Sequence, residues 1–242
     1  MPRGAVLGLA VALGLAATAH AQTAEQAADA NVAARGGLEA WRAVQSMTMI
    51  GLMDVGKGMQ VPFTLQLKRP RKMRLDFLFD GQLVMQAYDG TQGWKRQPHL
   101  GRAGVEPLSE EEMESAAGQT DLDGPLVDFR AKGHQVELLG HEEVEGRDTL
   151  KLAVTLAAGT TRHLYLDAET FLEVKVDGTR RGGGKDRPME TFFRDYRPVE
   201  GLLIPHTLES RLEGAPSSHK LVIESVELNP ELPDALFTPP AS

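Results

Sequence analysis

Apolar and polar residues alternate along most of the chain from residue 46 onward, and this period of two constrains the fold more than any other feature. The pattern is regular over residues 61–67 and 73–79, and turns such as Asp80-Gly81 and Asp89-Gly90 end the runs. Strict alternation with Gly-containing turns is typical of antiparallel strands that bury one face. Similar runs cover residues 134–143, 149–157, 161–167, 171–178, 188–198, 202–213 and 218–229. We therefore expect a mainly β fold of about eleven strands.

Two stretches depart from the alternation and have helical character. Residues 23–44 are rich in alanine and lack proline, which predicts a helix ending near Gly36-Gly37 and a short second helix through Trp41. Ser109 precedes three glutamates, the pattern of a capped helix start, and Gly124-Pro125 then predicts an irregular segment. A sheet of this size must curl or close, and these segments are the candidates to cover its apolar face.

The first 21 residues have the layout of an export signal. Arg3 gives a positive start, an apolar run (GAVLGLAVALGLAA) follows, and Ala19-His20-Ala21 fits the small-x-small cleavage pattern. We expect cleavage after Ala21, which leaves residues 22–242 as a single domain in the periplasm. The apolar run is too short for a comfortable membrane span, so a retained anchor is the minor alternative.

Composition excludes several classes of protein. The chain of 242 residues has a formal net charge of −8 and no cysteine. An acidic surface argues against a nucleic-acid binder, which needs a basic face to meet phosphates. Without cysteine, the exported chain has neither disulfides nor a thiol for lipid anchoring. The most basic run, residues 178–187 (GTRRGGGKDR), contains several glycines and predicts a long hairpin loop.

No motif for catalysis or metal binding stands out. The histidines beyond the leader show no i, i+4 pair of the kind that holds zinc on a helix, so we expect no metal and no cofactor. A Gly-x-Ser-x-Gly elbow is absent, and no cysteine nucleophile exists. A triad assembled from residues distant in sequence stays open as a hydrolase alternative, but the sequence favours a protein that is not an enzyme.

One predicted sheet face is rich in flexible apolar side chains. Six of the nine methionines fall between Met47 and Met85. Methionine suits sites that accept variable apolar ligands, and a curled sheet capped by short helices tends to leave a cavity. Ordinary core packing is the alternative. The predicted lining residues are Phe63, Leu65, Leu67, Met73, Leu75, Phe77, Phe79, Met85 and Trp94, with Leu152, Val154, Leu164 and Leu166 on a facing wall.

Six stretches spread over nearly all of the mature chain carry a resemblance to a known family. They are ARGGLEAWRAVQSMTMIG (34–51), AYDGTQGW (87–94), GRDTLKLAVTL (146–156), HLYLDAETFLEVKV (163–176), FFRDYRPVEGLLIP (192–205) and ESVELNPELPDALFTPP (224–240). Together they resemble the LolA/LolB-like superfamily of bacterial periplasmic lipoprotein carriers, in particular the outer membrane lipoprotein-sorting proteins. The motifs are mostly structural, so they specify a fold better than a ligand.

The resemblance implies an incomplete antiparallel β-barrel with a helical plug, whose lining binds lipoprotein acyl chains or another lipid. An acyl chain in water costs about 0.8 kcal/mol per CH₂, and a concave apolar face removes that cost without covalent chemistry. The lack of cysteine departs from the anchored LolB-type acceptor. The expected partners are a lipid or an acylated lipoprotein, an envelope protein as donor or acceptor, and transiently the membrane.

A second reading of the same resemblance is a signalling module. The half-barrel shape also occurs in periplasmic sensors that bind a regulatory protein and respond to lipid. The sequence therefore predicts a carrier, with a sensor or adaptor that binds a regulatory or envelope protein as the alternative.

Overall fold

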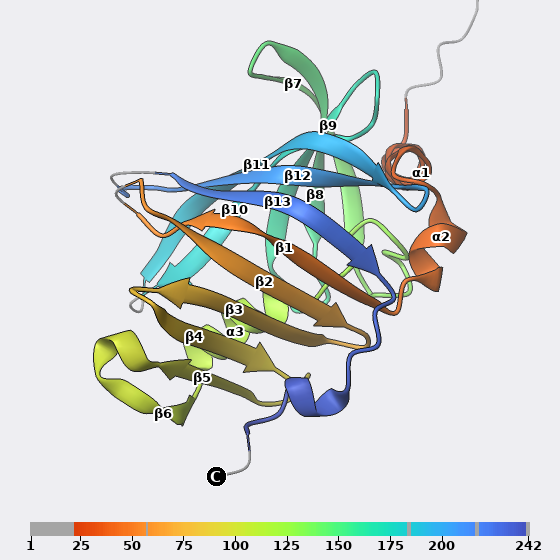
Figure 1. The fold of residues 1–242 in the computed structure, drawn as a ribbon. Helices are drawn as coiled ribbons and strands as arrows, with labels where there is room; N and C mark the ends of the chain where they lie inside the picture. Colours follow the sequence, from red (N-terminus) through yellow and green to blue (C-terminus); the bar gives the residue numbers. More distant parts are fainter. Residues whose placement is uncertain (1–21, 57, 183–184, 216–217, 241–242) are drawn as a thin grey trace, which may run out of the picture.

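Thirteen antiparallel strands form one open sheet in the described part of the chain (Figure 1). The computed structural model describes residues 22–56, 58–182, 185–215 and 218–240, so the predicted leader and its cleavage site lie outside the described residues. The strand order is β6-β5-β4-β3-β2-β1-β13-β12-β11-β10-β9-β8-β7. The sheet does not close, and the prediction of a mainly β, incomplete antiparallel barrel is confirmed.

Consecutive strands form hairpins within β1–β6 and within β7–β13. The strands are β1 (Ser46–Asp54), β2 (Gln60–Lys68), β3 (Lys72–Phe79), β4 (Gln82–Tyr88), β5 (Gly93–Gln97), β6 (Arg102–Pro107), β7 (Gln135–Val144), β8 (Arg147–Thr155), β9 (Thr161–Asp167), β10 (Glu173–Gly182), β11 (Lys185–Val199), β12 (Leu202–Leu212) and β13 (His219–Leu228). The helices are α1 (Ala24–Ala34), α2 (Leu38–Ala43) and α3 (Glu110–Gly118), with short 3₁₀ turns η1 (Pro98–Leu100) and η2 (Asp234–Leu236).

The first and last strands meet in the middle of the sheet. β1 pairs with β2 on one side and with β13 on the other. A β-bulge between Ile50 and Gly51 marks this seam. A Cβ atom at Gly51 would lie 2.0 Å from the carbonyl oxygen of Val222, so only glycine allows the two strands to approach this closely.

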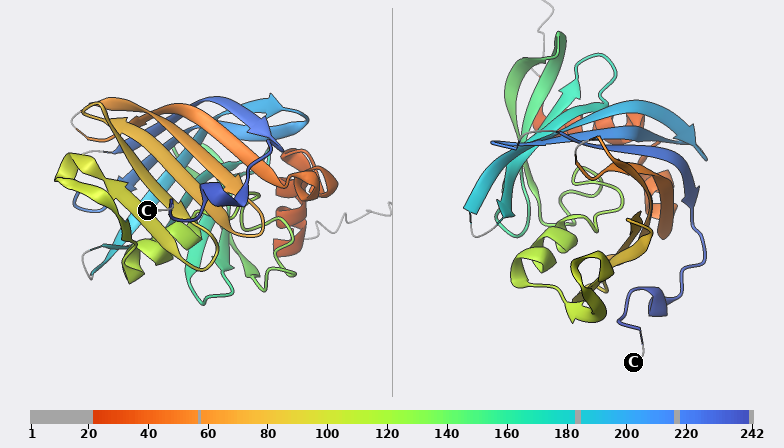
Figure 2. Two further views of the ribbon diagram at one scale, coloured as in Figure 1. Left: turned by 60° about the horizontal axis from the view of Figure 1, so that its bottom comes forward. Right: turned by 60° about the vertical axis from the view of Figure 1, so that its left-hand side comes forward.

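The two edge strands are consecutive in the sequence, and the chain between them crosses the concave side of the sheet. α3 lies against β4 and β10, and α1 lies against β7. Figure 2 shows the curled sheet with α3 and the segment after it inside the curve. Thr23 and Ser109 each complete a capping box, and the predicted cap at Ser109 is confirmed. Within the described residues, no helix has the length and apolar character needed to cross a membrane.

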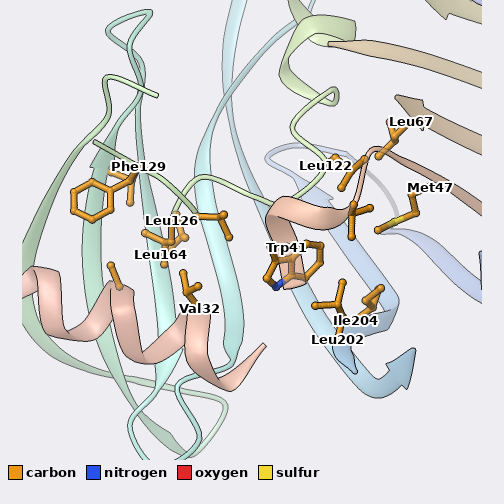
Figure 3. Close-up of a cluster of buried hydrophobic side chains, with 14 of the residues drawn as sticks. Val32, Trp41, Met47, Leu67, Leu122, Leu126, Phe129, Leu164, Leu202 and Ile204 are labelled. Atoms are coloured by element: carbon orange, nitrogen blue, oxygen red, sulfur yellow. The ribbon is translucent and has the colours of Figure 1, made fainter. Parts of the chain in front are cut away.

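The main core lies between this covering layer and the concave face. We call the covering layer the plug; it consists of α1, α2, α3 and residues 119–133. Trp41 of α2 is 1% exposed and sits at its centre. Figure 3 shows Trp41 between one group of side chains that includes Leu126 and Leu164 and another that includes Met47 and Leu67.

Two details of the sheet differ from the sequence prediction. Thirteen strands are present where about eleven were expected, and the unexpected β6 contains both Gly104 and Pro107 in a run without alternation. The predicted loop over residues 178–187 is wrong, because β10 and β11 continue to pair through Arg181↔Asp186 and Gly182↔Lys185. Cross-strand pairing extends a hairpin whose glycines and charges, taken alone, indicate a loop.

The end of the chain runs across the convex face. We call residues 229–240 the strap. Lys68 of β2 donates to the Leu232 carbonyl, Arg74 of β3 donates to the Leu236 carbonyl, and Trp94 of β5 donates to the Phe237 carbonyl. Phe237 is fully buried there. The strap therefore gives this part of the sheet a second apolar layer, on the face opposite the plug.

Candidate functional site

Cross-strand registers place most of the predicted lining residues on the concave face. Every second pair between β2 and β3 is apolar: Leu67–Met73, Leu65–Leu75 and Phe63–Phe77. Phe79 follows Phe77 at the same parity. On the facing wall Leu152 pairs with Leu164 and Leu150 pairs with Leu166. Directly opposed residues in antiparallel strands point to the same face, so these side chains form two apolar walls that face each other.

The two walls differ in how deeply the plug covers them. The covered lining residues are at most 5% exposed and pack in the same cluster as Trp41; they are Leu67, Met73, Leu152, Val154, Leu164 and Leu166. Leu65, Leu75, Phe77 and Phe79 lie on the same concave face but are only half-buried. Phe63 is 2% exposed. The concave face is thus filled at one end and partly accessible at the other.

Met85 and Trp94 require a correction, because they lie on the convex face. Met85 pairs with Asp76, which alternates with the inward Leu75 and Phe77. Trp94 pairs with Ala87 and donates its indole N–H to the Phe237 carbonyl of the strap at 3.0 Å. A shift of one residue flips a strand side chain to the other face. The convex side of β4 carries Leu83, Met85 and Ala87, whereas its concave side includes Gln82 and Gln86. The alternation in β4 therefore marks the face that the strap covers.

A buried carboxylate fastens the plug. Asp123 is 2% exposed. Its carboxylate accepts from Arg69 at 2.5 Å and from Lys132 at 2.6 Å, while its backbone carbonyl accepts from Arg35 at 3.0 Å. Burial alone would raise the pKa of Asp123, yet hydrogen bonds with Asp121, Arg69 and Lys132 outweigh burial and hold it below its ordinary value. Asp123 therefore joins α1, the irregular segment and the sheet.

Arg69 also connects Asp123 to α2. The side chain projects from the turn between β2 and β3 and also donates to the carbonyls of Val44 and Trp41. We call Asp123, Arg69, Lys132 and Arg35 the latch. Sequence reasoning missed the latch. The sequence does show Asp121 and Asp123 alternating with apolar residues, which singles out the two aspartates. The pattern does not identify the residues that bind them.

A cavity opens at the edge of the plug. About 460 Å³ lies between α1, the start of α2 and residues 126–131. Its apolar lining includes Val32, Leu38 and Phe129, and its charged lining includes Asp128 and Arg130. This volume is within the range of about 300–1,000 Å³ usual for small-ligand sites. None of the predicted lining residues borders this cavity, because the plug itself fills the space between the walls.

The arrangement offers little for catalysis in the described residues. No group of three or more His, Asp or Glu side chains there could hold a metal ion. Two His–Asp pairs exist, with His141 Nδ1 2.9 Å from Asp148 and His163 Nδ1 2.8 Å from Asp177. Neither histidine hydrogen-bonds a serine within the described part of the chain.

Comparison of the sequence with known protein families and with curated proteins gives no match. Solved structures do match. A LolA superfamily protein from Nitrosomonas europaea superposes with a TM-score of 0.59 and 14% identity, over 90% of this chain and 98% of that one. A DUF1329 family protein from Desulfovibrio piger gives a TM-score of 0.57 and 15% identity, over 89% and 97%. A domain named for outer membrane lipoprotein sorting, from Vibrio parahaemolyticus, gives 0.57 and 13%, over 88% and 95%.

These structures agree with the geometry of the sheet and plug. An incomplete antiparallel barrel with an apolar concave face and a helical cover is the class of fold that the chain adopts. More narrowly, the chain has a LolA-like fold. At this level of identity the similarity concerns the fold alone.

Proposed function

We propose that the mature chain is an exported, non-enzymatic carrier that binds an acyl chain or another lipid on its concave face. One observation carries the proposal: the side chains that fill the space between the two walls come from the plug, outside the strands. Moving the plug would uncover Leu67, Met73 and Leu164 without breaking a strand pairing. The fold shared with a domain named for lipoprotein sorting favours this reading.

The energies involved are consistent with a reversible plug. About fifteen CH₂ groups leaving water gain roughly 12 kcal/mol. Separating a buried carboxylate from its partner costs about 3–5 kcal/mol, which is smaller than this gain. The apolar residues of the plug must also find new contacts, and the half-buried Leu75 and Phe77 lie next to the filled end. A lipid could therefore replace the plug without any covalent step.

The test uses neighbouring residues on opposite faces of β3. Leu75→Glu with Phe77→Glu places two charges on the concave face, and we expect binding of a synthetic palmitoylated lipopeptide to weaken by more than about tenfold. Leu78→Glu is the matched control, because Leu78 is 45% exposed on the convex face. Native mass spectrometry of residues 22–242 measures the bound mass. Equal binding by all three proteins would contradict the carrier proposal.

A second candidate is a protein-binding adaptor, favoured by an apolar row on the convex face. Leu78 and Leu83 pair across β3 and β4 and are 45% and 42% exposed. Leu52 lies in the same row on β1, between Pro62 and Val222. An adaptor would co-purify with one stoichiometric protein and lose it on Leu78→Glu, whereas a carrier would co-purify with material that extracts into organic solvent.

A further inference from the structure

Several polar side chains gather inside the apolar plug, where α1 meets α2 and β10. Asn31 is fully buried, Arg35 is 6% exposed, and Trp41 is 1% exposed. Glu173, the first residue of β10, is 7% exposed. Buried polar groups in folded proteins nearly always have hydrogen-bond partners, so each group in this cluster calls for one.

Part of the cluster is paired, and this pairing fixes its orientation. The Asn31 side-chain amide donates to the Phe171 carbonyl at 2.8 Å, which turns its oxygen the other way. Arg35 donates through one terminal nitrogen to the Asp123 carbonyl at 3.0 Å. The guanidinium carbon of Arg35 lies 4.4 Å from the centre of the Trp41 ring. Arg35 is the C-cap of α1, one helical turn after Asn31, so Arg35 has Asn31 on one side and Trp41 on the other as neighbours.

Three atoms of these same side chains have no hydrogen-bond partner within the described residues. They are the Asn31 Oδ1, the Arg35 Nε and the Trp41 Nε1. Arg35 and Glu173 form an ion pair without a direct hydrogen bond, because the distance from Arg35 Nη1 to Glu173 Oε1 is 3.7 Å. By contrast, the indole N–H of Trp94 is bonded to the strap. Among the described residues the same condition is met by His99 Nδ1 alone outside this cluster, so three of the four buried open atoms lie together here.

We propose that Asn31, Arg35 and Trp41 form a buried site for a small neutral group that both accepts and donates hydrogen bonds, namely a hydroxyl or an amide. Its oxygen would accept from Arg35 Nε–H and Trp41 Nε1–H, and its own hydrogen would go to Asn31 Oδ1. Glu173 balances the charge of Arg35, which favours a neutral group over a carboxylate. The group belongs either to water or to the polar end of a lipid. The lipid assignment rests on the proposed carrier function.

The first experiment is a high-resolution crystal structure of residues 22–242 without added lipid. An ordered oxygen within hydrogen-bonding distance of both Arg35 Nε and Trp41 Nε1 supports the site, and a water molecule there identifies solvent as one source. Bonds from both N–H groups to protein carbonyls, with no such oxygen, overturn it.

The second experiment tests the lipid as a source with two probes of equal chain length. N-dodecanoylethanolamine carries an amide and a hydroxyl, whereas 1-chlorododecane has no comparable head. We expect Trp41→Phe, which keeps the ring but removes one donor, to weaken binding of the first probe about tenfold and leave the second unchanged. Trp94→Phe is the matched control, and it should alter neither affinity.

The outcomes distinguish failure of the proposed buried site from failure of the proposed carrier function. If wild-type protein binds neither probe, the carrier proposal fails, and an ordered water in the crystal still supports the site. If wild-type protein binds both probes and Trp41→Phe weakens them equally, the carrier proposal stands and the lipid assignment of the site is overturned, because Trp41 then acts through packing alone.

Discussion

The two ends of the concave face have the same kind of residue but a different cover. At one end Leu152 is fully buried against the plug, and at the other Leu75 on the facing wall is only half-buried. Both leucines lie on regular strands, and alternation places both on the same face of one sheet. Alternation therefore decides which face is apolar. A segment from elsewhere in the chain decides whether that face is core or accessible surface.

The largest expected effect tests this difference directly. Leu152→Ala removes a fully buried side chain from a packed cluster, and it should lower the free energy of unfolding by about 2–5 kcal/mol. Leu75→Ala removes the same atoms from a half-buried position, and it should cost about 1 kcal/mol. Urea denaturation of both variants measures the difference. Equal losses would show that the two ends are one uniform core.

An intermediate effect is expected at the latch. Asp123→Asn removes the charge that holds Arg69 and Lys132, and it should cost about 1–3 kcal/mol near neutral pH. Since the pKa of Asp123 is lowered in the folded protein, its contribution is present above the unfolded value of about 3.9 and is lost as pH falls through the folded value. Unfolding curves of wild type and variant should therefore converge in acid.

The same variant, Asp123→Asn, tests whether the plug can unfold locally while the sheet stays folded. Hydrogen exchange should rise in α1, α2 and residues 119–133 of Asp123→Asn, while the central strands β1 and β13 keep their protection. Uniform loss of protection over the whole sheet would mean that the plug and the sheet unfold together, which argues against a movable cover.

The smallest effect is expected on the convex face. Asp234 of the strap accepts from Lys68 and Lys72, and hydrogen bonds from these lysines lower its pKa to about 2. Its side chain is 64% exposed, so Asp234→Asn should lower the melting temperature by less than about 2 °C. This contribution is present above about pH 4 and fades toward pH 2. Lipopeptide binding should not change; a clear loss would place the strap in the binding site.

Local signals in the sequence predicted most of the fold but only part of the candidate site. Alternation and capping residues such as Ser109 predicted the sheet face and the helix starts, because both depend on near neighbours. Met85 and Trp94 were assigned to the wrong face, because the strap that buries them comes from the far end of the chain. The sequence around Asp123 did not indicate its partner for the same reason, because Arg69 is distant in sequence.

The seam between β1 and β13 has a consequence for the order in which the protein acquires its structure. Strands β1–β6 and β7–β13 are each linked by hairpins and can pair as soon as they are made. Their junction at the centre of the sheet requires residues 219–228, near the end of the chain. Until those residues arrive, two half-sheets expose unpaired strand edges, so the nascent chain is most prone to aggregation just before residues 219–228 pair with β1.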